Sequence, residues 1–229
     1  MNTLKINIAL WSARICLLSF LIWIISFIGI ALSSPLFLWS DLEQYESYYV
    51  SHSQFFSYFA KIWMILFSLS FLVLILTWNE FSNQETKILT KIGSAFALLF
   101  AICSSIHYFS QISCVRFALN NGTTSGLEHF LQANPTSFSS SVNMLGWGLF
   151  LGLSSFFLFF ESKLNQRSKG VRIGFLIVAV SCILGCLCFL LQIDIGTFLF
   201  INIGLGGGMI LLSISIILQF KTFKKNITI

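Results

Sequence analysis

The sequence has few charged residues. Only 9% of its 229 residues are Asp, Glu, Lys or Arg, whereas 56% are hydrophobic and the mean hydropathy is +0.88. A soluble domain carries about 25% charged residues, so this scarcity excludes a water-soluble fold. The net charge of +5 comes from basic residues scattered between hydrophobic runs, and this pattern does not indicate a nucleic-acid partner. The sequence therefore predicts a polytopic membrane protein whose main partner is the lipid bilayer.

The sequence also lacks motifs for metal, cofactor and catalytic chemistry. Its six cysteines form no CxxC pair and its three histidines are far apart, so we expect no metal site and no cofactor. HExxH is absent, and residues 152–155 (Gly-Leu-Ser-Ser) lack the second glycine of a nucleophile elbow. We therefore assign no catalytic residue. Cys114 and Cys188 are near the predicted outer ends of their helices, and the sequence leaves a disulfide between them open.

The sequence does contain six long hydrophobic runs. We predict one integral membrane domain over residues 1–229, an all-α transmembrane bundle of six helices. Its spans are expected near residues 9–32, 58–78, 92–115, 142–160, 171–191 and 198–220. The first run gives a helix of about 36 Å, which crosses a hydrocarbon core of about 30 Å with some tilt. We therefore expect this run to be retained and not cleaved as a signal peptide.

Lysine and arginine gather in alternate connectors. They lie before the first span, after the second and fourth spans, and in the C-terminal tail, whereas the other three connectors have only Arg116 at a boundary. Short cytoplasmic segments of membrane proteins are enriched in basic residues. The pattern therefore predicts an even number of spans with both termini cytoplasmic.

The two long connectors that lack basic residues each contain a helix-start pattern. Residues 40–43 (Ser-Asp-Leu-Glu) and 125–128 (Ser-Gly-Leu-Glu) match the capping box. Apolar residues at helical spacing follow both matches. We predict two short interfacial helices on the outer side, beginning near Asp41 and Gly126.

The second and fourth predicted spans each have a charged residue at one end. Lys61 is within one turn of the outer end of the second span, where it can reach water or a carboxylate of the connector 34–56. We expect those connector carboxylates to be solvated, not to form a cation site. Glu161 follows the fourth span and begins the most basic connector, residues 161–172.

Glycine spacing indicates where helices meet. Gly148 and Gly152 in the fourth span, and Gly204 and Gly208 in the sixth, are each four residues apart, a spacing that lets two helix backbones approach closely. We expect this packing to lie within one chain. A homo-oligomer formed through the sixth helix is the alternative.

A polar stripe interrupts the third span. His107 and Gln111 are four residues apart and share a helical face with Ser104. Such groups are costly in contact with lipid, so we expect them to face the bundle and line its outward-facing side. The candidate ligand-binding residues are Ser104, His107, Tyr108, Gln111 and Asn143. In the alternative, purely structural reading, a neutral His107 hydrogen-bonds a neighbouring helix through Asn143 or Asn202.

Three short motifs in this region occur in a recognisable order. They are residues 108–116 (Tyr-Phe-Ser-Gln-Ile-Ser-Cys-Val-Arg), 134–135 (Asn-Pro) and 145–147 (Leu-Gly-Trp). The set resembles an uncharacterised family of bacterial six-helix integral membrane proteins, over about 40 residues. The resemblance implies the inner (plasma) membrane of a bacterium and brings no activity with it. Members often carry acidic residues just before Leu-Gly, where this chain has Val-Asn-Met at 142–144, so no acid-dependent role is implied.

The sequence leaves three function classes open. The first, which we favour, is a non-enzymatic protein that binds or moves a small amphiphile through the outward-facing polar patch. The second is a structural or accessory membrane subunit. The third is an intramembrane enzyme, which would require His107 to meet a serine, cysteine or carboxylate across the bundle.

Overall fold

The computed structural model describes residues 3–227, and over this range the chain is helical with no strand. Six helices in it are long and apolar enough to cross a membrane. They are Thr3–Ser33, Phe55–Asn79, Lys87–Asn121, Phe138–Leu164, Lys169–Leu190 and Asp194–Lys225. The chain is therefore an all-α, multi-pass membrane protein, as the hydrophobic runs predicted.

Three of the membrane helices contain a π-helical turn. The uninterrupted ones are α1 (Thr3–Ser33), α3 (Phe55–Asn79) and α8 (Lys169–Leu190). The third membrane helix is α4 (Lys87–Ser110) and α5 (Arg116–Asn121), joined by the π turn Gln111–Val115. The fourth is α6 (Phe138–Met144), the turn Leu145–Phe150 and α7 (Leu151–Leu164); the sixth is α9 (Asp194–Phe198), the turn Leu199–Gly204 and α10 (Leu205–Ile227). Such turns are frequent at functional sites, and the first of them begins at the candidate residue Gln111.

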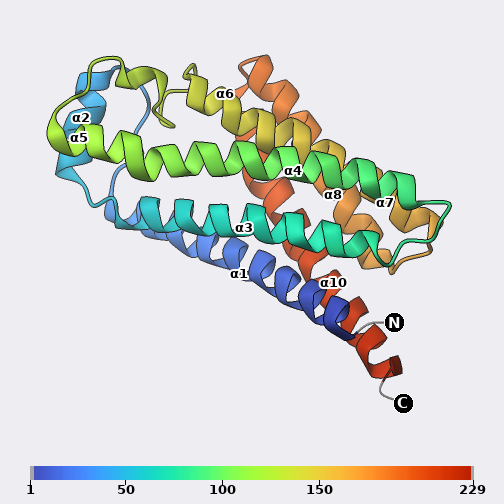
Figure 1. The fold of residues 1–229 in the computed structure, drawn as a ribbon. Helices are drawn as coiled ribbons and strands as arrows, with labels where there is room; N and C mark the ends of the chain where they lie inside the picture. The colour runs from blue at the N-terminus through green and yellow to red at the C-terminus, as the bar shows by residue number, and fades with distance from the viewer. Residues whose placement is uncertain (1–2, 228–229) are drawn as a thin grey trace.

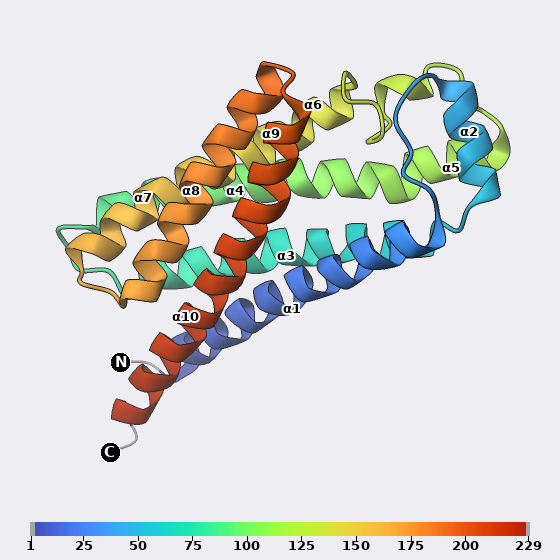
Figure 2. The ribbon, with the colours of Figure 1, turned by 180° about the vertical axis from the view of Figure 1, so that it is seen from behind.

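The membrane helices form a closed ring. Each packs against the next along the chain, and α10 returns to pack against α1 (Figures 1 and 2). Aromatic rings fill the centre: Phe67 stacks on Trp147 with centroids 5.5 Å apart, and Phe20 and Phe100 meet these two rings edge-on. The middle of the ring is thus packed, and space for a ligand has to be sought toward its ends.

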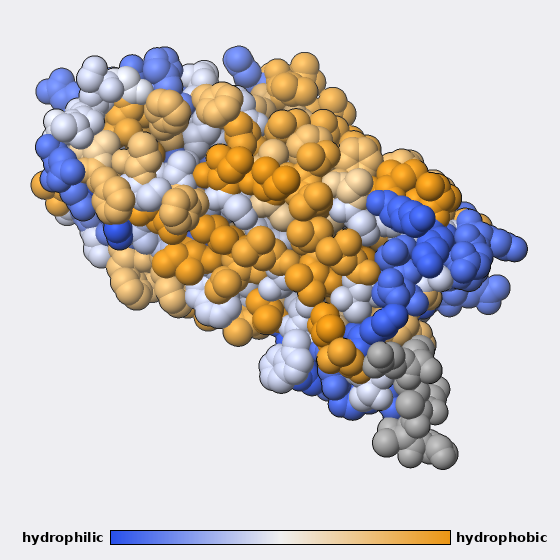
Figure 3. All heavy atoms as spheres, in the orientation of Figure 1, coloured by the Kyte–Doolittle hydropathy of each residue, from blue (hydrophilic) through white to orange (hydrophobic). Residues whose placement is uncertain are grey.

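The two ends of the bundle differ in charge, because the basic connectors lie at only one of them. Helix α1 begins and α10 ends beside the α3–α4 and α7–α8 connectors (Figures 1 and 2), where Lys5 pairs with Glu80 at 2.5 Å and Lys224 donates to Asn7 at 2.9 Å. Figure 3 shows hydrophilic residues gathered at this end, next to a broad apolar belt. We call it the terminal end, and the opposite end, which carries α2 and α5, the roofed end.

The first interfacial helix is present at the roofed end as α2 (Leu42–Ser51). Its N-cap is Asp41, whose carboxylate accepts a hydrogen bond of 2.8 Å from the backbone N–H of Gln44. Ser40, the first residue of the capping-box match, donates to the Gln44 side chain instead. The sequence thus predicted the helix and its start near Asp41.

The second interfacial helix is shorter than expected. Only a 3₁₀ turn, Leu127–His129, forms after residue 126. Gly126 has a φ of 76°, a left-handed conformation that glycine adopts without strain, and no side chain caps the turn. The capping box expected at residues 125–128 is therefore wrong, because the left-handed glycine turns the chain where a capping residue would be extended.

The glycine pairs lie at contacts between helices of one chain. A Cβ added to Gly148 would lie 2.6 Å from the Cβ of Cys186, and one on Gly152 would lie 3.0 Å from that of Cys182, both on α8. Gly204 and Gly208 face α8 in the same way. The expected packing within one chain is confirmed. The six cysteines, Cys114 and Cys188 included, are free thiols.

Candidate functional site

His107 and Gln111 hold the segment 130–139 against α4. The Nδ1 atom of His107 is 3.0 Å from the backbone carbonyl oxygen of Ser139 and 2.9 Å from its hydroxyl. Gln111 donates through Nε2 to the Phe130 carbonyl (2.6 Å) and the Ser139 hydroxyl (3.1 Å), and its Oε1 accepts from the backbone N–H of Gln132 (3.1 Å). We call this set of contacts the latch.

Both latch side chains are buried in the bundle, as the sequence predicted. His107 and Gln111 are only 1% and 3% exposed, as the cost of polar groups in lipid requires. His107 does contact a neighbouring helix, as the structural reading expected, but its partner is Ser139 of α6 and not Asn143 or Asn202, so the named partners are wrong. Ser139 precedes the fourth predicted span, but helix α6 begins at Phe138 and brings this serine over the third helix.

The other three predicted site residues cluster nearby without forming the latch. Tyr108 is buried and meets the His107 ring edge-on, with centroids 4.8 Å apart. Ser104 is fully buried, and within the described chain its hydroxyl has no hydrogen-bond partner. Asn143 is half-buried, with its Oδ1 similarly unpartnered. Ligand binding by these residues stays a prediction.

His107 and Ser139 form the pairing that an intramembrane enzyme would require, but in an unsuitable arrangement. A carbonyl oxygen can only accept, so its contact at 3.0 Å assigns the proton to His107 Nδ1. That nitrogen therefore cannot take a proton from the Ser139 hydroxyl. No carboxylate orients the ring either: within residues 3–227 no ion pair to His107 forms, and the amide side chain of Gln132 lies beside the ring. The pair fits a structural contact better than a nucleophile and its base.

A cavity of about 440 Å³ opens beside the latch at the roofed end. Its apolar wall comes from the end of α1 and the segment after it: Phe27, Ile30, Ala31, Pro35, Leu36 and Phe37. Its polar wall comes from α2, the α2–α3 connector, α3, the third membrane helix and the segment 130–139: Tyr45, Tyr48, Ser53, Gln54, Ser57, Lys61, Gln111 and Gln132. Of the five residues predicted for the site, only Gln111 lines this cavity.

Lys61 is the one lining residue with a formal charge. Its Nζ donates to the hydroxyl of Ser57 one turn away (2.5 Å) and lies 5.5 Å from the centroid of the Tyr58 ring. Within residues 3–227, no carboxylate forms an ion pair with it. The sequence left two partners open for Lys61, water and a loop carboxylate, and the expectation of a carboxylate is therefore wrong.

The remaining polar groups of the wall are neutral. Burial, reinforced by neighbouring Tyr49 and Tyr48, raises the pKa of the Tyr45 phenol to about 12, so this hydroxyl keeps its proton at physiological pH. Amide and hydroxyl groups make up the rest of the polar wall. The cavity thus combines one cationic group, neutral hydrogen-bonding groups and an apolar wall.

A small apolar cluster shares Tyr45 with the lining of the cavity. Val115, Leu127 and Leu131 are buried together, and Trp39, Leu42 and Tyr45 pack on them from the α2 side. The hydroxyl of Tyr49 bonds to that of Tyr58 on α3 and to Asn120 on α5, each at 3.0 Å. Helix α2 is therefore fixed to two membrane helices, which holds its tyrosines in the cavity wall.

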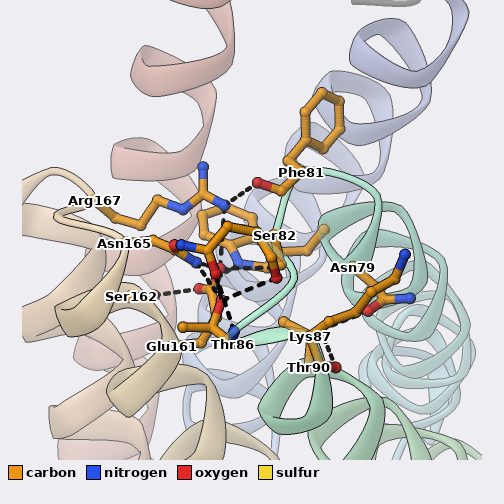
Figure 4. A network of polar contacts seen from close by, with 12 residues as sticks. Asn79, Phe81, Ser82, Thr86, Lys87, Thr90, Glu161, Ser162, Asn165 and Arg167 are labelled. Atoms are coloured by element: carbon orange, nitrogen blue, oxygen red, sulfur yellow. Dashed lines mark hydrogen bonds and ion pairs between the residues drawn. The ribbon is translucent and has the colours of Figure 1, made fainter.

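A second polar network lies at the terminal end, around Glu161 of α7 (Figure 4). This carboxylate is fully buried. Its Oε2 accepts from Trp78 (2.8 Å) and Ser162 (3.3 Å), and its Oε1 accepts from Ser82 (2.7 Å), Asn165 (2.6 Å) and Arg167 (3.1 Å). Both oxygens are thus occupied by protein donors, so the network joins α7 to the α3–α4 connector and has no free position for a ligand.

Sequence reasoning missed this network because it placed Glu161 only in a basic connector. The available signal was a single acidic residue directly after a hydrophobic run, with Arg167 six residues later. The structure buries this pair, and the Arg167 guanidinium also lies 5.0 Å from the centroid of the Trp78 ring. Only the folded helix end shows that the carboxylate turns inward.

Within residues 3–227, no three His, Cys, Asp or Glu side chains are grouped closely enough to hold a metal ion. No known protein family, curated protein or solved structure matches this chain.

Proposed function

We propose that this membrane protein binds a small amphiphile with an anionic head group in the cavity at its roofed end. The observation that carries the proposal is Lys61, a lysine without a carboxylate partner among the described residues, in a wall that is otherwise neutral. Ionisable residues within membrane helices are expensive and commonly mark a ligand site. A carboxylate or phosphate would supply the missing charge.

The shape and lining of the cavity support the same ligand class. About 440 Å³ is within the usual range for small-molecule sites, roughly 300–1,000 Å³. Head-group oxygens would accept hydrogen bonds from Lys61, Ser57 and Gln54, while an acyl chain would lie along Phe27 and Ile30. Gln111 would contribute from the latch side.

The proposed location is the plasma membrane with both termini cytoplasmic. The basic connectors lie at the terminal end, which supports this orientation. The cavity would then face the outer side, where an amphiphile could enter from the outer leaflet.

A structural or accessory role is the second candidate. It is favoured by the latch, in which His107 and Gln111 are used to hold the protein's own segment 130–139. Under this role the cavity would have no preference for an anionic amphiphile.

Binding of oleate and oleyl alcohol to the purified full-length protein separates the two candidates. These probes have similar chains and differ in head-group charge. Lys61→Met should weaken oleate binding roughly tenfold or more, because a hydrogen bond to a charged group contributes about 1.5–3 kcal/mol, and should leave oleyl alcohol unchanged. The control is Lys91→Met, the same change at an exposed position of α4. Equal oleate binding by the two variants would reject the proposal and favour the structural role.

A further inference from the structure

A basic groove lies between α7 and α8 at the terminal end. It encloses about 300 Å³ and is lined by Lys163, Lys169 and Arg172 together with Phe159, Ile173 and Leu176. Figure 3 shows hydrophilic residues bordering the apolar belt at this end of the molecule. The groove thus joins a cationic rim to an apolar wall.

The helix directions place the cations nearer the terminal end and the apolar residues deeper in the bundle. Helix α7 runs toward the terminal end, so Phe159 is one turn deeper in the bundle than Lys163. Helix α8 runs away from this end, so Leu176 is one turn deeper than Arg172. Four residues correspond to about 6 Å along a helix, which matches the step from a lipid head group to its first chain segments.

The three cations lack acidic partners. No ion pair to any of them forms within residues 3–227, and the buried Nε of Arg172 has no hydrogen-bond partner there. By contrast, two other basic residues of this end, Lys5 and Arg167, are paired with Glu80 and Glu161. Positive charge in the groove is therefore not neutralised by the described protein.

We propose that this groove binds an anionic phospholipid, with phosphate oxygens on Lys163, Lys169 and Arg172 and an acyl chain along Phe159, Ile173 and Leu176. Basic pockets between membrane helices at this level suit phosphate head groups. The apolar wall favours a lipid over free phosphate. The site is separate from the cavity around Lys61, which lies at the other end of the bundle.

The test is lipid binding to delipidated full-length protein, measured by native mass spectrometry. The probes are cardiolipin and phosphatidylcholine with the same acyl chains. The triple variant Lys163→Gln, Lys169→Gln, Arg172→Gln is compared with the triple variant Lys221→Gln, Lys224→Gln, Lys225→Gln. Both lose the same charge from the same end of the protein. The groove variant should bind cardiolipin roughly 100-fold more weakly than the wild type, about fivefold for each cation removed.

Phosphatidylcholine binding should not change, and the tail variant should keep most of its cardiolipin affinity. Competition by inorganic phosphate at millimolar level would point to a free-anion site and overturn the lipid assignment. Equal losses of cardiolipin affinity in the two triple variants would show that the groove is not the binding site. If the triple variant does not fold, Lys163→Gln and Lys169→Gln, both at exposed positions, are measured singly; no loss in either would likewise contradict the proposal.

Discussion

At the scale of single residues, each end of the molecule has a network of buried polar side chains. His107 and Gln111 are turned inward because lipid offers no hydrogen bonds, and this direction followed from their spacing alone. Their partner could not be predicted in this way. Ser139 is 32 residues from His107 and 28 from Gln111, and the intervening chain is mostly irregular. Glu161 is the opposite case. Its position in a basic connector predicts a solvent-exposed side chain, but the fold buries it.

Removing the Glu161 carboxylate should destabilise the protein strongly. Glu161→Ala leaves Arg167 buried without its counter-charge, and breaking a buried pair costs about 3–5 kcal/mol. Equilibrium unfolding in mixed micelles measures the change in the free energy of unfolding. Glu85→Ala, at an exposed position of the same end, should change it by less than about 0.5 kcal/mol. Similar values for the two variants would contradict the role assigned to the network.

At the scale of helices, local sequence predicted most elements and missed the irregular ones. Helix α2 followed from the capping-box match at residues 40–43 and from the apolar spacing after it, although the residue that caps it is Asp41 and not Ser40. The 3₁₀ turn at Leu127–His129 and the three π-helical turns did not follow, because they depend on how the chain packs on its neighbours. The π turn that begins at Gln111 lies directly where the latch holds segment 130–139.

Glycines at helix contacts should tolerate substitution by alanine much less well than glycines without close neighbours. Gly148→Ala would place a methyl group 2.6 Å from the Cβ of Cys186, so the π turn Leu145–Phe150 and α8 would have to separate. Overpacking of this kind costs about 1–3 kcal/mol. Gly207→Ala is the matched control, because no atom lies within 4 Å of the added Cβ and alanine favours a helix by about 1 kcal/mol.

Thermal unfolding in detergent should therefore show a lower Tm for Gly148→Ala and an unchanged or higher Tm for Gly207→Ala. A lower Tm for Gly207→Ala alone would mean that α10 has a packing partner outside the chain. That result would favour the homo-oligomer, which stays a prediction.

At the scale of the whole molecule, hydropathy predicted the six membrane helices. The orientation that the charge pattern indicates stays a prediction. The closure of the ring by α10 on α1 was not predictable, since it depends on contacts between the two ends of the chain. The cavity was only partly predictable. Gln111 belongs to it, but Lys61 and the wall from α1 come together only when α2 and segment 130–139 form the roof.

The orientation in the membrane gives a prediction for the whole fold. Single cysteines are introduced at Ser40, Ser125 or Ser168, three exposed positions, in a variant without the native cysteines. A membrane-impermeant maleimide should label the first two in intact cells, and Ser168→Cys only after permeabilisation, because basic connectors stay cytoplasmic. Labelling of Ser168→Cys in intact cells would reverse the orientation and turn the cavity toward the cytoplasm.

The most direct measurement of the central claim is an experimental structure of the full-length protein with a fatty acid brominated at mid-chain. The anomalous signal of bromine reports where the chain lies. The account predicts a bromine peak between Phe27, Ile30 and Phe37, with carboxylate density within hydrogen-bonding distance of the Lys61 Nζ. Bromine peaks found only on the outer, lipid-facing surface of the helices, with no carboxylate at Lys61, would contradict it.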